Sequence, residues 1–132
     1  MTRGLSARAL FVLAIGLLAA ACGSGNGEST IPTTPNPPGS LTFTITSAGV
    51  SPTSLTVGAG SQITFINNDV VEHAMHSDPH PEHTECTELN QVGFLSPGQS
   101  RQTGNLNAAR TCRFHDHGQP FNTSLQGIIV IR

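Results

Sequence analysis

The stretch that decides the fold runs from Val57 to His73 and reads VGAGSQITFINNDVVEH. Gly58-Ala59-Gly60 is typical of a turn. Ile63-Thr64-Phe65 then alternates apolar and polar side chains, the period of a β-strand with one buried face. The strand ends in Asn67-Asn68, and His73 follows after four further residues. The stretch therefore predicts a strand that is followed closely by a histidine.

Short alternating segments recur on both sides of this stretch, with turn signals such as Ser96-Pro97-Gly98 between them. No segment beyond the N-terminal region shows a convincing helical period. The pattern predicts an all-β domain, either a sandwich or a barrel. The last segment is nearly all apolar, which predicts a central strand. The expected strands cover residues 41–46, 55–57, 63–65, 110–114 and 125–131.

The first forty residues carry the pattern of an exported lipoprotein. Arg3 and Arg8 precede the apolar run 9–21, which is too short for a convincing membrane span and reads as a signal peptide over residues 1–21. Small residues followed by Cys22 resemble the bacterial lipoprotein signal, in which that cysteine is lipidated. Residues 22–40 then form a disordered linker of Gly, Ser, Thr, Asn and Pro. We expect a lipid-anchored protein of the bacterial cell envelope, facing the periplasm or the exterior, with its folded domain at residues 41–132.

The charge of the chain excludes one class of partner. Without residues 1–21, four of its six basic residues remain against eight acidic ones, and the sequence contains no lysine. The remaining arginines are scattered, so the positive stripe that nucleic acids require is absent. We therefore expect no nucleic-acid partner.

All six histidines lie between His73 and His117, in company with Cys86 and Cys112. A thiolate with two imidazoles is the donor set that suits copper in an electron-transfer site. Cys112 and His115 are separated by two residues, and His73 lies far upstream. The spacing predicts one copper ion held by His73, Cys112 and His115.

Three stretches, in order, resemble the plastocyanin-like cupredoxins. They are the 57–73 stretch quoted above, the segment from Leu95-Ser-Pro-Gly-Gln to Arg110-Thr-Cys-Arg-Phe-His115, and Leu125-Gln-Gly-Ile-Ile-Val-Ile131. The resemblance implies a Greek-key β-sandwich with copper near one end. His73 would be the first ligand, Cys112 the thiolate and His115 the second imidazole. It also implies one-electron transfer with a redox partner protein.

The fourth, axial ligand departs from this family. Leu125 stands where the resemblance places an axial methionine, and a leucine cannot coordinate. The loop 116–124 before it is also longer than in plastocyanins. His117 lies two residues beyond His115 and is a possible further ligand, because alternate residues of a strand share a face. Met75 could supply a thioether, although a role in filling the core is as compatible with its position.

A second departure is an insertion at residues 75–90, MHSDPHPEHTECTELN. It reads either as a polar surface loop or as an auxiliary metal site. Pro79 and Pro81 flank its central histidine and predict an extended segment. The auxiliary candidates are His76, His80, His83 and Cys86.

Two states of the cysteines remain open. In an oxidising compartment, Cys86 and Cys112 are expected to form a disulfide. A disulfide sulfur is not a thiolate ligand, so the bridge would leave a metal site built from histidines such as His73, His80 and His115. The position of Cys112 in the cupredoxin pattern favours the free thiolate instead.

These observations give three functional hypotheses. The first is a membrane-tethered cupredoxin that transfers single electrons. The second is a non-blue, histidine-based copper module for storage, delivery or tolerance, with a copper-handling partner. The third, a copper enzyme, is less favoured because the chain has no second domain to form a substrate cleft. We expect a carrier or binding protein rather than an enzyme. Phe94, Phe114 and Phe121 are candidate contacts for a partner, although core packing is the simpler role for each.

Overall fold

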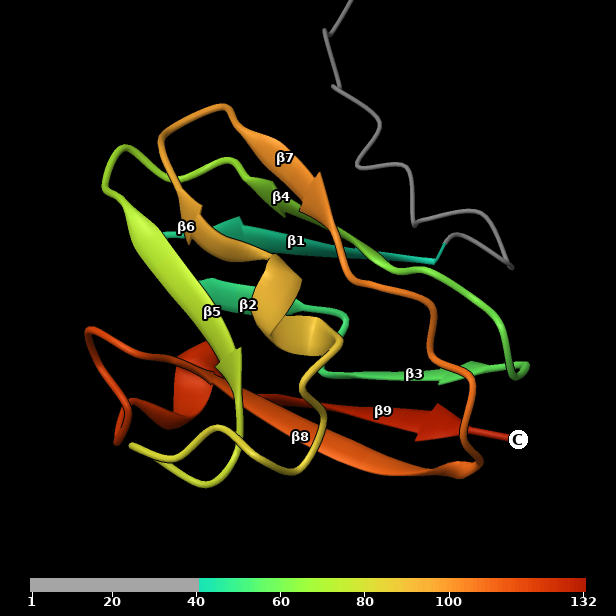
Figure 1. Cartoon of the computed structure of the whole chain (residues 1–132). Coiled ribbons are helices and arrows are strands. Elements are labelled where there is room, and N and C mark those ends of the chain that lie inside the picture. The colour runs from blue at the N-terminus through green and yellow to red at the C-terminus, as the bar shows by residue number, and fades with distance from the viewer. Residues whose placement is uncertain (1–40) are drawn as a thin grey trace, which may run out of the picture. The chain divides into compact units, whose positions relative to one another are not determined.

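The structure, a computed structural model, describes residues 41–132, which form a sandwich of two β-sheets (Figure 1). The predictions for the signal peptide, for Cys22 and for the linker lie outside the described residues. Over residues 41–132 there is no helix long and apolar enough to cross a membrane. The elements are β1 (Thr42–Thr46), β2 (Gly49–Ser51), β3 (Ser54–Val57), β4 (Thr64–Asn67), β5 (His73–Ser77), η1 (Leu89–Gln91), β6 (Gly93–Leu95), β7 (Ser100–Gln102), β8 (Arg110–Asp116), η2 (Thr123–Leu125) and β9 (Gly127–Ile131).

The two sheets are both mixed. One has the order β2-β1-β4-β7, with β1 and β4 parallel, and the other has the order β3-β9-β8-β5-β6, with β3 and β9 parallel. Strand β9 lies between β3 and β8, so the prediction that the last apolar segment is a central strand is confirmed. The all-β sandwich predicted from the sequence is confirmed as well.

The core lies between the sheets and is centred on three aromatic rings. Phe43 and Phe65 come from the first sheet and Phe114 comes from the second. The ring centroids of Phe43 and Phe114 are 4.8 Å apart, and those of Phe65 and Phe114 are 5.1 Å apart. Burying a phenylalanine completely contributes about 1.5–3 kcal/mol to folding. These contacts fix the second sheet against the first. The second sheet includes the neighbouring strands β5 and β8, so their positions are fixed as well.

Several element boundaries differ from the sequence prediction, and two of these differences bear on the site. The last strand begins at Gly127 rather than at residue 125, because Asn122 starts the short helix η2 and its side chain accepts a hydrogen bond from the Ser124 N–H. The predicted insertion 75–90 begins inside a strand, since β5 runs to Ser77. The sequence HAMHS of β5 lacks the polar-apolar alternation of the predicted strands, and the three-residue strands β2, β6 and β7 were not predicted either. The loop that follows β5 therefore starts at Asp78.

Candidate metal centre

Strand β8 presents two different sets of side chains, because successive residues of a strand point to opposite faces of a sheet. Cys112 and Phe114 belong to the hydrophobic core, and Asp116 continues this inward set. Arg113 and His115 alternate with them and point outward. Strand β8 therefore supplies side chains to both the inward and the outward face of its sheet.

Strand β5 is divided in the same way. Its His73 pairs with the core residue Leu95, which places the imidazole on the inward face. His76 pairs with His115 across β5 and β8, on the outward face. The structure therefore does not bring the predicted ligands His73 and His115 together, because the two imidazoles lie on opposite faces of the same sheet.

The cysteines form a disulfide between Cys86 and Cys112, whose Cα atoms lie 5.7 Å apart. Both residues are fully buried in the core. Of the two alternatives left open by the sequence, the structure has the disulfide, so Cys112 offers no thiolate in this structure. A blue-copper donor set of one thiolate and two imidazoles does not fit this arrangement.

His73 occupies a pocket of carboxylates on the inward face. Its Nδ1 lies 2.8 Å from Asp116 Oδ2, and its Nε2 lies 3.3 Å from Asp69 Oδ2. The other Asp116 oxygen accepts hydrogen bonds from the N–H groups of Ala74 and Gly118. Both ring nitrogens of His73 are thus engaged by carboxylates. The arrangement ties β5 to the end of β8 and leaves His73 no free nitrogen for a metal.

Met75, a candidate thioether donor, and Leu125, the non-coordinating residue at the axial position, are both buried in the core. Met75 is fully buried and packs in the core, so it fills space rather than supplying a thioether to the histidines. Leu125 is also a core residue, within η2. Neither side chain completes a metal site.

The loop after β5 folds back over the outward face instead of extending. The His83 N–H donates to the Pro79 carbonyl over 2.7 Å, which closes a turn around His80. The prediction that Pro79 and Pro81 hold this segment extended is therefore wrong. His83 itself has a φ of 52°, in the left-handed region that residues other than glycine rarely adopt. Such conformations persist only where the surrounding structure holds them.

Several bonds hold this turn against β8. The Asp78 N–H donates to the Arg113 carbonyl, and the Glu85 carboxylate accepts from both the backbone and the guanidinium of Arg113. Asn90 donates to the His83 carbonyl from the other side. The disulfide at Cys86 joins the end of the loop covalently to β8. The loop is thus a fixed part of the sheet surface.

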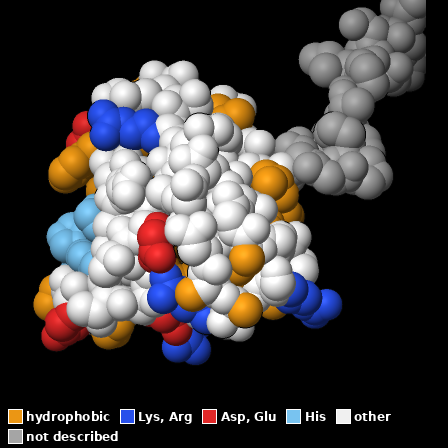
Figure 2. All heavy atoms as spheres, turned by 45° about the vertical axis from the view of Figure 1, so that its right-hand side comes forward, with side chains coloured by type: hydrophobic (Ala, Val, Ile, Leu, Met, Phe, Trp, Pro, Cys, Tyr) orange, Lys and Arg blue, Asp and Glu red, His pale blue; other side chains and the backbone are white. Residues whose placement is uncertain are grey.

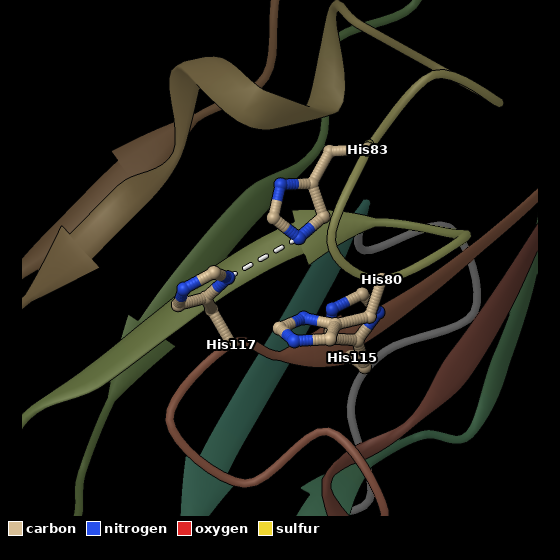
Figure 3. Close-up of side chains that lie close together, drawn as sticks. All are labelled: His80, His83, His115 and His117. Atoms are coloured by element: carbon tan, nitrogen blue, oxygen red, sulfur yellow. Dashed lines mark hydrogen bonds between the residues drawn. The ribbon is translucent and has the colours of Figure 1, made fainter.

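This folding brings four histidines together (Figure 3). Two come from the loop and two from β8 and the residue after it. Each offers one ring nitrogen, and these nitrogens all lie within 4.8 Å of one another. Nitrogens that share one ion through bonds of about 2.0–2.1 Å lie at most about 4.2 Å apart, so a small inward movement of the rings closes the site. The four histidines, which we call the histidine cluster, are His80, His83, His115 and His117.

His115 is prepared for a metal by its other ring nitrogen. Its Nδ1 lies 2.6 Å from Asp78 Oδ1, and a carboxylate there fixes the proton on Nδ1. The remaining Nε2 is then an acceptor, and this buried atom has no hydrogen-bond partner within residues 41–132. A buried acceptor without a partner is costly unless a ligand satisfies it. The histidine–carboxylate pair is the arrangement found around histidine metal ligands.

Burial and mutual repulsion lower the pKa of two imidazoles on this face, those of His76 and His83. Desolvation by burial, with repulsion from His83, His117 and His115, lowers the pKa of His76 to about 4. The pKa of His83 is also lowered, first by desolvation and then by the neighbouring histidines. A metal ligand must be unprotonated. At neutral pH these rings are therefore in the form that binds a metal.

The sequence-based prediction missed two residues of functional interest. Asp78 and Asp116 each bond one histidine, but neither was among the site residues predicted from the sequence. Of the three phenylalanines, Phe114 is a core residue, whereas Phe94 and Phe121 are 59% and 90% exposed. The expectation that Phe94 and Phe121 pack in the core is therefore wrong. Phe94 lines a 190 Å³ cavity together with His73 and His117.

The chain matches no protein-family model. It matches no curated protein sequence either. It does resemble solved structures. A purple cupredoxin from Nitrosopumilus maritimus is 15% identical, with a TM-score of 0.53 over 69% of this chain and 98% of that protein. A reduced amicyanin variant is 19% identical, with a TM-score of 0.55 over 72% of this chain and 84% of amicyanin. The Cu(I) form of another amicyanin variant is 20% identical, with a TM-score of 0.55 over 71% of this chain and 83% of that protein.

These solved structures are cupredoxins, and they match most of the described part of this chain in fold. At such identities they establish the fold and leave the site to be judged from its own residues. Residues 41–132 therefore form a domain with the cupredoxin-like fold that the sequence predicted.

Proposed function

We propose that this protein is a copper-binding protein of the bacterial cell envelope, anchored by a lipid at Cys22, whose copper site is the histidine cluster. One observation carries the proposal. His115 Nε2 is buried without a partner among residues 41–132, and His115 is one of four histidines whose ring nitrogens, one from each, lie within 4.8 Å of one another. The anchor rests on the signal-peptide pattern and on the small residues before Cys22.

Copper is favoured over other metals by the donor set. Imidazole suits zinc, copper, iron and nickel, but among the divalent ions of the first row copper binds nitrogen sites most strongly. Cupredoxin-like structures include an amicyanin variant in its Cu(I) form, which supports the same choice. When bound, copper supplies a one-electron Cu(II)/Cu(I) couple. With the thiol of Cys112 in a disulfide, the site is histidine-based and not a blue one.

The residues of the cluster have different tasks. His115 is buried and held by Asp78, so it provides the fixed donor. His80 and His117 are exposed and open the site to the surface. Figure 2 shows histidine side chains gathered at one edge of the molecule, within reach of solvent. This exposure suits exchange of copper with a partner that handles the metal.

We therefore place copper storage, delivery or tolerance first, with a copper-handling protein as partner. One-electron transfer to a redox partner is the second candidate, and the cupredoxin-like fold favours it. In either role the protein acts as a binding protein or carrier rather than as an enzyme. The exposed Phe94 and Phe121 are contacts that a partner protein could use.

A copper titration of the protein with its disulfide intact tests the proposal. We expect one Cu(II) ion per chain, a pale spectrum without an intense thiolate-to-copper band, and no free thiol by alkylation and mass measurement. His115→Gln should abolish tight binding, and Thr111→Ala, on the same face of β8, should leave it unchanged. Tight zinc binding with weak copper binding would overturn the choice of metal. An intense blue band would overturn the histidine site.

A further inference from the structure

A fifth histidine adjoins the cluster on the same face of the sheet. His76 lies on β5 directly across from His115 on β8. Its ring centroid is 4.5 Å from that of His83 and 5.4 Å from that of His117. These distances are as short as those inside the cluster, where the rings of His80 and His117 are 4.9 Å apart. His76 is therefore in contact with the site while remaining outside the set of four.

The rings of His83 and His117 contact both His80 and His76. His83 and His117 approach each other most closely through nitrogen, at 3.2 Å between Nε2 and Nδ1. On one side of this pair lies His80, and His76 also contacts both rings. The pair therefore belongs to two overlapping groups of three histidines.

The polar surroundings of His76 differ from those of His115. A carboxylate holds the His115 ring, whereas the His76 ring makes no hydrogen bond to any residue in the range 41–132. It is half-buried, and the rings that neighbour it are histidines. An imidazole in such a place gains little from protein partners. The ring can therefore turn toward an ion without breaking a hydrogen bond to residues 41–132.

We propose that His76 is a fifth imidazole donor of the copper site, one that is not clamped and that joins or leaves the metal. This inference rests on the proposed function, because it requires copper in the histidine cluster. Copper changes its preferred geometry between Cu(II) and Cu(I). A movable donor lets the site satisfy both states while His115 stays in place.

The experiment compares His76→Gln and His76→Phe with the wild type. Phenylalanine keeps the ring contacts with His83 and His117 but has no nitrogen, so it separates coordination from packing. Thr111→Ala, a residue outside the cluster on β8, is the matched control. The readouts are the Cu(II) dissociation constant by chelator competition, the number of imidazole nitrogens coupled to Cu(II) by pulsed EPR, and the thermal midpoint of the metal-free protein.

We expect both variants to weaken Cu(II) binding, by about 10-fold or more, as judged from the 10- to 100-fold effects of residues around metal ligands. Both should also change the EPR spectrum and lower the imidazole count. If His76→Phe binds copper like the wild type with the same spectrum, His76 only packs and the inference is wrong.

The wild type alone gives a second test that does not depend on the variants folding. Isotopically labelled histidine should show five coupled imidazoles in the Cu(II) protein. A count of four or fewer contradicts the inference and leaves the histidine cluster standing. Failure of the wild type to bind copper at all contradicts the proposed function instead.

Discussion

His115 and Asp116 are neighbours on β8, yet their side chains serve opposite faces of the sheet. His115 joins the histidine cluster on the outward face, and Asp116 holds His73 on the inward face. Because a strand has a period of two, a single residue step separates the two places. The position at which a cupredoxin pattern would assemble its copper ligands is thus occupied by a histidine–carboxylate pair.

Removing the carboxylate behind His115 should weaken the metal site without unfolding the protein. In Asp78→Asn, the amide no longer fixes the proton on His115 Nδ1, so Nε2 is less available to the metal. We expect Cu(II) affinity to fall by about 10- to 100-fold. Competition with a chelator measures this loss. Glu82→Gln, a neighbouring acid with no hydrogen bond to the cluster within residues 41–132, is the control, and equal effects of the two variants would argue against a specific role for Asp78.

Freeing the Cys112 thiol should not create blue copper. Cys86→Ala breaks the disulfide, but Cys112 remains a core residue and His73 keeps both nitrogens bonded to carboxylates. We expect no intense visible band when Cu(II) is added to this variant. The appearance of such a band would show that Cys112 and the histidines can meet, against the division of faces described above.

The same disulfide should matter to stability and to the loop. Its loss in the double variant Cys86→Ala/Cys112→Ala should lower the free energy of unfolding by about 2–5 kcal/mol. Because Cys86 ends the loop that carries His80 and His83, Cu(II) binding should weaken as well. Urea unfolding and chelator competition measure the two effects. An unchanged affinity would show that the remaining bonds to Arg113 hold the loop by themselves.

The His73–Asp116 pair should support the fold and not the metal. His73→Gln leaves the carboxylates of Asp116 and Asp69 buried without their partner. Removing the hydrogen-bond partner of a buried acceptor costs about 1–3 kcal/mol. We expect a lower thermal midpoint and an unchanged Cu(II) EPR spectrum. Loss of copper binding at unchanged stability would instead identify His73 as a ligand.

The lowered pKa values predict how stability depends on pH. The pKa of His76 falls to about 4 on folding, from 6.5, and that of His83 is lowered too. Between pH 4 and 6.5 the unfolded chain therefore binds more protons than the folded one, so these groups make the metal-free protein less stable as pH drops. Urea unfolding across this range should show a smaller fall in His76→Gln than in the wild type. Identical pH profiles would contradict the lowered pKa of His76.

The fold could be predicted because its signals are local. The alternation in segments such as 41–46 and 63–65, together with the order of the matching stretches, identified the sandwich. Strand β5 was missed because HAMHS has no alternation, and its assignment depends on pairing with β8.

The site was harder to predict, because a shift of one residue along a strand moves a side chain to the other face of the sheet. The spacing from Cys112 to His115 fitted a shared site, but in a continuous strand the two residues point to opposite faces. Nor does the sequence show that the turn at Pro79 folds back, since that depends on hydrogen bonds to Arg113 and on the disulfide.

The measurement that tests the central claim most directly is the anomalous diffraction of crystals of the copper-loaded protein at the copper edge. The predicted result is one strong peak on the outward face of β8, bonded to the ring nitrogens of the histidine cluster, with the Cys86–Cys112 bridge intact. A peak on the inward face, between His73 and the sulfur of Cys112, would contradict the account.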